Sequence, residues 1–203
     1  MNIIGDIAGR YDELMLLLDK MPKGEEIILL GDLNDRGPKT KEVIQWAIDN
    51  KIRCTKSNHG QMMIDAYNIW LATGNPHGSW EFNMNGGLQT IQSYGGFEFI
   101  PKEHVEYLAN CEWFIETEDL LLTHAPIHPE FEFGMQLTTD FLWNRTRPKK
   151  RDKYQIHGHN SAFEVYIDDS GKEFGMCIDN CIDSTLMGIN SKTRITYLQE
   201  YLK

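Results

Sequence analysis

Residues 27–37 read Ile27-Ile28-Leu29-Leu30-Gly31-Asp32-Leu33-Asn34-Asp35-Arg36-Gly37. The apolar run predicts a short buried strand over 26–30 that ends at the Gly-Asp pair. Two carboxylates three residues apart, Asp32 and Asp35, then precede Arg36 directly. The first carboxylate can bind a metal ion, the second can hold a histidine in one tautomer, and the arginine can grip phosphate oxygens in a forked contact. A helix cap followed by a surface arginine explains only one of these residues, so the segment predicts a strand that ends in a site for phosphate.

The same arrangement, an apolar strand with polar residues at its end, occurs on both sides of this stretch. Residues 2–4 lead to Asp6, and residues 52–56 lead to Asn58 and His59. Helical spacing of apolar residues over 11–21 and 40–50 predicts a helix between each pair of strands. This alternation favours a layered α/β fold, in which ligands bind beyond the carboxyl ends of the strands. We therefore expect Asp6, Asp32 and Asn58 to converge in space.

The remainder of the chain divides into a helical segment and a strand-rich second half. Residues 61–110 are mostly helical in pattern, and we expect a small helical insertion or lid at about 66–110 within one domain that spans 1–203. Its aromatic residues, Trp80 among them, are expected to pack in the core or the lid. Strands are predicted at 113–116, 120–123, 154–156, 163–167, 176–178 and 193–198, with a hairpin turn at 168–171.

Composition and charge limit the classes of partner. The net charge is −10, which disfavours extended binding along a nucleic-acid backbone. One basic cluster is either a local guide for an anionic substrate or a solvated loop, and it comprises Arg145, Arg147, Lys149, Lys150, Arg151 and Lys153. The sequence has no apolar run long enough to span a bilayer, no secretory signal at its start and no CxxC pair among its four cysteines. These features favour a cytoplasmic protein with no membrane partner.

The order of the motifs resembles that of the calcineurin-like metallophosphoesterases. The family pattern of GDxHG, GDxxDRG, GNHE, a strand-end HA and a late GH is matched by segments that begin at Gly5, Gly31, Ser57, His124 and Gly158. The resemblance is closest to the bacteriophage and bacterial Ser/Thr protein phosphatases, and Asn85-Gly86-Gly87 with Thr90 also resembles an element of that branch. The diadenosine tetraphosphatases are a neighbouring branch. The resemblance implies a layered α/β/β/α sandwich with a small helical insertion.

The resemblance also implies metal ligands, residue by residue. Asp32 would bridge two ions, Asp6 would serve the first ion, and the second ion would be completed by Asn58, His124 and His159. Oxygen and imidazole ligands suit manganese, and iron, zinc or nickel are compatible as well. We expect one or two divalent ions per chain.

Catalytic and substrate-binding roles are implied in the same way. His59 would be the general acid, held by Asp35, while a metal-activated hydroxide attacks phosphorus. Arg36 would bind the phosphate, with Arg145 and Lys56 as looser matches for the same role. The expected substrate is a phosphoprotein or a small phosphoester, which makes the chain a metal-dependent phosphomonoesterase of the Ser/Thr protein phosphatase kind. If a phage encodes the chain, we expect the protein to be located in the host cytoplasm.

The sequence departs from the family pattern at Ala8, where the family has a metal-binding histidine, and at Gly60, where it has an acid. Three readings follow from Ala8. Another group, with His157 as a candidate, fills the gap at the first ion; or that ion binds weakly; or the protein is a degenerate, non-catalytic phosphate-binding module. An enzyme that acts on diadenosine polyphosphates, RNA or nucleotides is a further alternative. His77, His104 and His128 are expected to be incidental, and the oligomeric state cannot be predicted.

Overall fold

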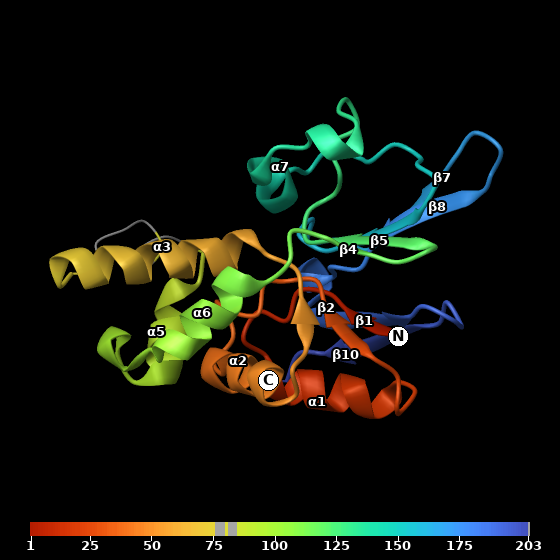
Figure 1. The fold of residues 1–203 in the computed structure, drawn as a ribbon. Helices are drawn as coiled ribbons and strands as arrows, with labels where there is room; N and C mark the ends of the chain where they lie inside the picture. Colours follow the sequence, from red (N-terminus) through yellow and green to blue (C-terminus); the bar gives the residue numbers. More distant parts are fainter. Residues whose placement is uncertain (76–79, 81–84, 203) are drawn as a thin grey trace.

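Two mixed sheets of five strands form the centre of the computed structural model, which describes residues 1–75, 80 and 85–202 (Figure 1). The first sheet has the order β10 (Thr196–Glu200), β9 (Thr185–Asn190), β1 (Asn2–Ile4), β2 (Ile27–Leu29) and β3 (Arg53–Cys54). The second has the order β4 (Ile115–Glu116), β5 (Leu120–Thr123), β6 (Tyr154–His157), β8 (Glu173–Cys177) and β7 (Glu164–Ile167). Strands β1, β2 and β3 run parallel, as do β5, β6 and β8. Each sheet therefore presents several carboxyl ends along one edge.

Side chains that alternate between the two faces of each strand produce the layers. Ile3 and Ile28 face the second sheet in a core that both sheets share, whereas their neighbours Ile4 and Leu29 face the helices. Because successive side chains of a strand point to opposite faces, a fully apolar strand fits only between two covering layers. Helices α1 (Tyr11–Lys20) and α2 (Thr40–Asp49) supply the outer layer of the first sheet.

The outer face of the second sheet is covered more thinly. Leu121 of β5 points away from the shared core and packs with Ile127 and with Phe141 of the short helix α7 (Thr138–Trp143). Figure 1 shows α7 on the far side of this sheet from α1 and α2. The predicted α/β/β/α sandwich is therefore confirmed, with a single turn-rich segment as its fourth layer.

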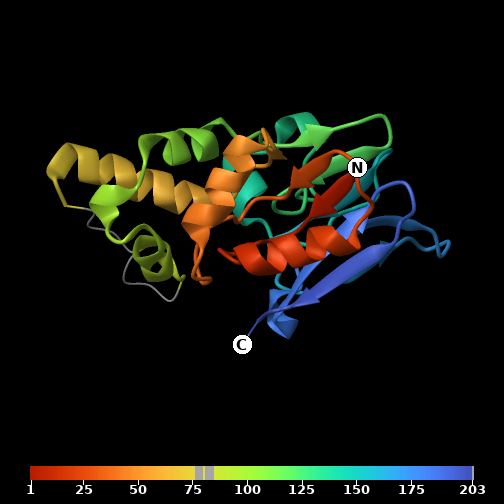
Figure 2. The ribbon, with the colours of Figure 1, turned by 90° about the horizontal axis from the view of Figure 1, so that it is seen from below.

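The chain between β3 and β4 forms a helical insertion, whose described residues include α3 (Asn58–Thr73), α5 (Gly87–Tyr94), the 3-10 helix η1 (Phe97–Phe99) and α6 (Lys102–Asn110). Both ribbon views place it beside the two sheets (Figures 1 and 2). It starts earlier than the predicted residue 66, because α3 follows the strand end directly. Residues 76–79 and 81–84, which include His77, lie outside the described residues.

A buried histidine ties the insertion to α2. His104 of α6 is fully buried, with Nδ1 at 2.7 Å from the hydroxyl of Tyr94 in α5 and Nε2 at 3.0 Å from Oε1 of Gln45 in α2. Burial lowers the pKa of His104 to about 4, which keeps its ring neutral near neutral pH. His104 was expected to be incidental, but it joins three helices.

One α-helix and one strand were not predicted from the sequence, and β8 and β10 differ in their bounds from the strands predicted at 176–178 and 193–198. Helix α7 was not predicted, and β9 was missed although it lies between β1 and β10. β9 contains Gly188, whose missing side chain leaves room for Ile4 and Met21: a Cβ there would lie 2.9 Å from Cδ1 of Ile4. A glycine inside a strand weakens the sequence signal although the packing requires it. No helix in the described part of the chain is long and apolar enough to cross a membrane.

Candidate active site

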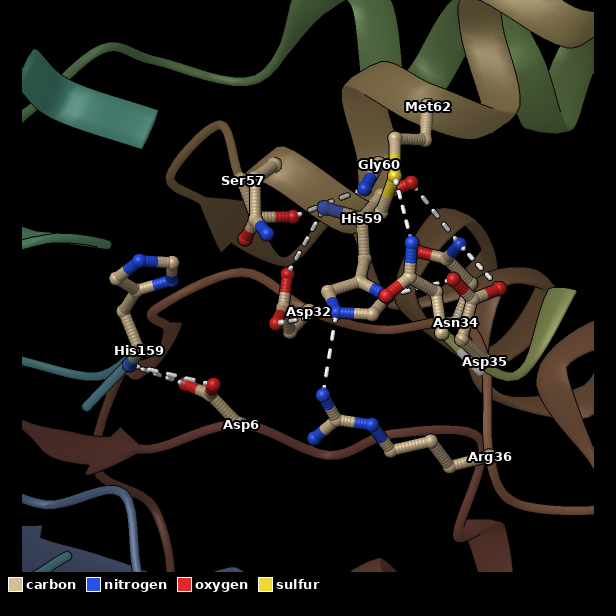
Figure 3. Close-up of polar contacts among 12 residues, drawn as sticks. Asp6, Asp32, Asn34, Asp35, Arg36, Ser57, His59, Gly60, Met62 and His159 are labelled. Atoms are coloured by element: carbon tan, nitrogen blue, oxygen red, sulfur yellow. Dashed lines mark hydrogen bonds and ion pairs between the residues drawn. The ribbon is translucent and has the colours of Figure 1, made fainter. Parts of the chain in front are cut away.

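Five strand ends from both sheets deliver the polar residues that the motifs contain. Asp6 follows β1, Asp32 follows β2, and Asn58 with His59 follows β3 in the first sheet. His124 follows β5 and His159 follows β6 in the second sheet. Asp6, Asp32 and His124 each offer a ligand atom within 4.8 Å of the others, and all three residues are buried. Figure 3 shows Asp6, Asp32 and His159 around one space, with the side chain of Arg36 reaching toward it.

The hydroxyl of Ser57 sets where α3 begins. Its Oγ accepts the backbone N–H of Gly60 at 3.2 Å, so Ser57 is the N-cap and the next two residues fall in the first turn. Asn58 and His59 therefore point back toward the strand ends. Gly60 stands where the family has an acid, and a Cβ on Gly60 would lie only 3.1 Å from the hydroxyl oxygen of Ser57. The glycine therefore suits the close cap.

Lone pairs face one another at the centre of the cluster. Nδ1 of His124 lies 2.8 Å from the carbonyl of Leu30 and donates to it, so Nε2 carries a lone pair. That Nε2 faces Oδ1 of Asn58 at 2.8 Å and Oδ1 of Asp32 at 3.5 Å. Nδ1 of His159 lies 3.1 Å away on another side. Nε2 of His124, Oδ1 of Asn58 and Oδ1 of Asp32 are thus acceptors that converge on one space, which suits a cation.

The ionisation states of the cluster also suit a cation. Burial lowers the pKa of His159 to about 2, and burial lowers that of His124 as well, so both rings stay neutral. Burial acts to raise the pKa of Asp32, but His124 and His59 lower it more, and its carboxyl stays ionised. Nε2 of His159 is buried and makes no hydrogen bond with any described residue. These donor atoms fit a divalent metal ion, which binds neutral imidazole and carboxylate oxygen.

Asp6 is held by the backbone of the second sheet. The N–H of His159 donates to both of its carboxylate oxygens at 3.2 Å. This contact requires Gly158, because a Cβ there would lie 2.1 Å from Oδ1 of Asp6. Burial, followed by the charges of Asp179 and Asp32, raises the pKa of Asp6 well above its ordinary value. Asp6 therefore lies among like charges, and a bound cation would reduce the repulsion between them.

Asp179 is a buried carboxylate that the sequence reasoning missed. It lies just beyond β8, and its oxygens accept the backbone N–H groups of Ser161 and Cys181. The strand predicted at 176–178 ends directly before this residue, so the position of a carboxylate after an apolar strand, as for Asp6 and Asp32, was a signal that could have identified it.

The conformation at Ala8 is unusual for a residue with a side chain. Its φ is 50°, and its N–H donates to the carbonyl of Asp32 at 2.7 Å. Asp32, Asp35, Arg36 and His159 also have positive φ values. Such values cost free energy and collect at functional sites. Ala8 itself brings no donor atom to the cluster.

His59 and Asp35 form a hydrogen-bonded pair beside the cluster. Nδ1 of His59 lies 2.6 Å from Oδ2 of the fully buried Asp35. The opposite ring nitrogen, Nε2, lies 3.9 Å from Oδ2 of Asp32 and 3.4 Å from Nη2 of Arg36. Burial acts to lower the pKa of His59, but the charge of Asp32 and the contact with Asp35 raise it above its ordinary value. In the neutral ring Nε2 can accept from Arg36, because a guanidinium only donates; in the protonated ring Nε2 carries a proton that faces the cluster, and this form persists to higher pH than in a free histidine.

The three cations predicted for phosphate binding lie in different surroundings. Burial acts to lower the pKa of the Arg36 guanidinium, but the nearby charges of Asp32 and Asp6 raise it above its ordinary value. Nη1 of Arg145 donates to the carbonyl of His159 at 2.7 Å, so this arginine borders the cluster. Lys56 points elsewhere: its ammonium donates to the carbonyl of Ala109 and lies 5.2 Å from the ring centre of Trp113.

The rest of the basic cluster at 145–153 forms ion pairs along the surface. Arg147 pairs with Glu164, Lys149 with Glu132, Lys150 with Asp168 and Lys153 with Glu116, and Arg151 donates to backbone carbonyls. Of the two interpretations left open, a solvated loop describes this segment better than a guide for anions.

The contacts of His157 are structural. Its Nε2 lies 2.8 Å from the hydroxyl of Tyr166, and the two rings stack. β6 ends at His157, and His159 then has a φ of 68°, so the strand alternation that would have put both histidines on one face does not continue. His128 lies in a loop, where its backbone contacts Gln136.

Comparison with known proteins matches this geometry. A family model described as calcineurin-like phosphoesterase matches residues 2–176. The serine/threonine-protein phosphatase 2 of Escherichia coli (strain K12) is 28% identical over 173 residues, which are 79% of this chain and 74% of that protein. A symmetrical bis(5'-nucleosyl)-tetraphosphatase of Erwinia tasmaniensis is 39% identical over 70 residues, which are 32% of this chain and 26% of that protein. A solved metallophosphoesterase from Sphaerobacter thermophilus shares the fold with a TM-score of 0.60 at 13% identity, over 100% of this chain and 88% of that one.

Proposed function

We propose that this chain is a metal-dependent phosphomonoesterase that acts on phosphorylated serine or threonine. The chain belongs to the calcineurin-like phosphoesterase family and is a hydrolytic phosphoesterase. The observation that carries the proposal is the pairing of two features. One is the set of facing acceptors around Nε2 of His124, and the other is the His59–Asp35 pair directed at the same space. A protein that only binds phosphate has no need of a held general acid, so this pairing argues against the non-catalytic alternative.

The metal ligands in this proposal are Asp6, Asp32, Asn58, His124 and His159. When bound, divalent ions supply activation of water and neutralise charge on the phosphoryl group. Manganese is the proposed metal, because carboxylate, amide oxygen and imidazole together suit it. The number of bound ions, one or two, depends on whether an ion binds beside Asp6, where Ala8 offers no ligand atom.

Substrate binding is assigned to two arginines. Arg36 reaches into the space beside Asp32, and its planar guanidinium can make two parallel hydrogen bonds to phosphate oxygens. Arg145 borders the cluster through the backbone of His159 and can turn its remaining N–H groups to the same phosphate. Lys56 is left out of this set, because its ammonium already contacts Ala109.

Proton delivery is assigned to His59. Asp35 accepts the hydrogen bond from Nδ1, which orients the ring and favours its protonated form, and in that form Nε2 carries the proton for the oxygen of the leaving group. Serine and threonine alkoxides are poor leaving groups, so their departure needs such an acid. The long alignment with a Ser/Thr phosphatase supports this substrate class. The shorter alignment with a diadenosine tetraphosphatase makes the nucleotide substrate the second candidate.

The test begins with metal-free protein that is assayed on p-nitrophenyl phosphate, a phosphothreonine peptide and diadenosine tetraphosphate while manganese is added back. We expect turnover of both monoesters to require manganese, and Asp32→Asn to lower kcat/KM by about 10³-fold, since several kcal/mol of metal stabilisation is lost. Asp19→Asn is the matched control, because Asp19 is exposed on α1 and pairs only with Lys23 among the described contacts. Turnover without metal, or an active Asp32→Asn protein, contradicts the proposal. A preference for the dinucleotide supports the second candidate.

A further inference from the structure

The carboxylate of Asp35 is held by four side chains in a fully buried position. Oδ2 accepts from Nδ1 of His59 at 2.6 Å and from Nε1 of Trp80 at 2.9 Å. Oδ1 accepts from Oγ1 of Thr90 at 2.8 Å and from Nδ2 of Asn34 at 2.9 Å. Two of the four donors, Trp80 and Thr90, belong to the part of the helical insertion that follows α3. The insertion therefore contacts the catalytic pair directly.

Thr90 is fixed by more than one hydrogen bond. Its hydroxyl donates to Asp35 and also accepts the backbone N–H of Asp35 at 2.8 Å. The hydroxyl of Thr40, at the start of α2, lies 3.1 Å away. Since a hydroxyl has one donor and two acceptor positions, these contacts use all of them. Thr90 is fully buried, so it cannot turn without breaking several contacts.

The two glycines that precede Thr90 allow this close approach. The carbonyl of Gly86 accepts the backbone N–H of Arg36 at 3.2 Å, and a Cβ on Gly86 would lie 2.4 Å from that nitrogen. A Cβ on Gly87 would lie 2.8 Å from Cε2 of Trp80. The Asn85-Gly86-Gly87 element with Thr90 thus brings the insertion against both Asp35 and Arg36.

We propose that Trp80 and Thr90 are positioning residues for proton delivery, and that the insertion completes the acid side of the active site. The inference rests on the proposed function, because it assumes that His59 protonates the leaving group. Held from four directions, Asp35 has one orientation, and through it the ring of His59 has one as well. Without the insertion's donors, Asp35 can rotate and the Nε2 proton of His59 loses its alignment with the ester oxygen.

Protonation of the leaving group by His59 can be tested selectively. Water oxygen forms a bond to phosphorus while the bond from phosphorus to the ester oxygen breaks, and the electron pair stays on the ester oxygen. His59 gives its Nε2 proton to that oxygen and regains a proton from solvent. An alkoxide leaving group depends on this proton, whereas p-nitrophenolate leaves readily without it. A misplaced acid therefore slows a phosphothreonine peptide much more than p-nitrophenyl phosphate.

The experiment compares kcat for these two substrates in Thr90→Val and Trp80→Phe proteins with manganese present. We expect kcat on the peptide to fall by about 10- to 100-fold, as for other residues that support a catalytic group, and kcat on p-nitrophenyl phosphate to fall by less than about 3-fold, because that step needs little acid. Thr90→Ser keeps the hydroxyl and is expected to restore the peptide rate. The controls lie in the same insertion: Trp70 packs on Tyr67 and Phe97, and the hydroxyl of Thr73 bonds within and just beyond α3. Trp70→Phe and Thr73→Val should leave the ratio of the two rates unchanged.

Three results would overturn the inference. They are an equal loss on both substrates, an unchanged rate on the peptide, and a Thr90→Ser protein as impaired as Thr90→Val. Calorimetric titration with manganese and thermal unfolding report whether each variant keeps its fold, and if Thr90→Val does not fold, Trp80→Phe and Thr90→Ser still decide the question. Failure of the unaltered chain to hydrolyse either monoester contradicts the proposed function itself, which separates that failure from this one.

Discussion

The two sides of the site satisfy their polar atoms in opposite ways. On the metal side, Nε2 of His124 faces Oδ1 of Asn58 and Oδ1 of Asp32, and all three atoms are acceptors. On the acid side, both oxygens of Asp35 accept hydrogen bonds from the protein's own donors, which Trp80 and Thr90 help to provide. A buried acceptor without a donor costs free energy. The metal side is therefore arranged for a ligand from outside, and the acid side is complete within the chain.

The origin of the residues differs as well. The metal side is drawn from strand ends of both sheets, which hold backbone and side chains in a rigid frame. The acid side depends on how the helical insertion packs against α2 and the loop at 32–37. We therefore expect changes to one side to leave the other largely intact, and the following predictions test that separation.

The largest effect is expected from His59→Asn, which removes the general acid. Turnover of a phosphothreonine peptide should fall by about 10²- to 10⁴-fold, while manganese affinity measured by calorimetry stays within about 2-fold, since His59 is not among the proposed ligands. His128→Asn, in a surface loop, is the control. A parallel loss of manganese affinity would mean that the two sides are not separate.

A smaller effect is expected from the pH dependence of stability through His104. Burial lowers the folded pKa of His104 to about 4, so the unfolded chain binds a proton first as the pH falls. The resulting stabilisation of the folded state is present above about pH 6.5 and is lost between about pH 6.5 and about pH 4. Between pH 7 and pH 5, the free energy of unfolding should fall by about 2 kcal/mol.

Urea unfolding at about pH 7 and about pH 5 measures this loss, and a His104→Gln protein should lose less stability over the same interval because glutamine does not titrate. The contact with Tyr94 and Gln45 links the insertion to α2, so acid should weaken the support of the acid side. An identical pH dependence in both proteins would remove His104 from this role.

The smallest effect is expected from Ala8→His, which restores a nitrogen on the side of Asp6. Ala8 has a φ of 50°, a conformation that histidine adopts more readily than most residues. The manganese concentration for half-maximal turnover should fall by about 10-fold, which corresponds to one additional ligand of modest strength. Ala8→Leu fills the same space without a nitrogen and serves as control. An unchanged requirement would show that another group already serves this side.

Much of the fold was predictable because it depends on local patterns. Apolar runs of three to five residues that end in Gly-Asp or Ser-Asn-His, separated by helices of regular apolar spacing, predict parallel strands with their carboxyl ends at one edge. The structure confirms the layers that follow from this. It also brings Asp6, Asp32, Asn58, His124 and His159 together. β9 and α7 escaped the prediction because a central glycine and a very short helix leave weak periodicity.

What only the tertiary structure decided concerns contacts between distant segments. Trp80 and Asp35 are 45 residues apart, and nothing near either one in the sequence reveals that the indole donates to the carboxylate. Likewise, Lys56 precedes its motif as expected, yet its ammonium turns to Ala109. The sequence by itself determined which residue types stand at the strand ends, because backbone period and turn chemistry are local. Their partners depend on packing across the whole chain, where burial leaves each polar atom only the neighbours that the fold supplies.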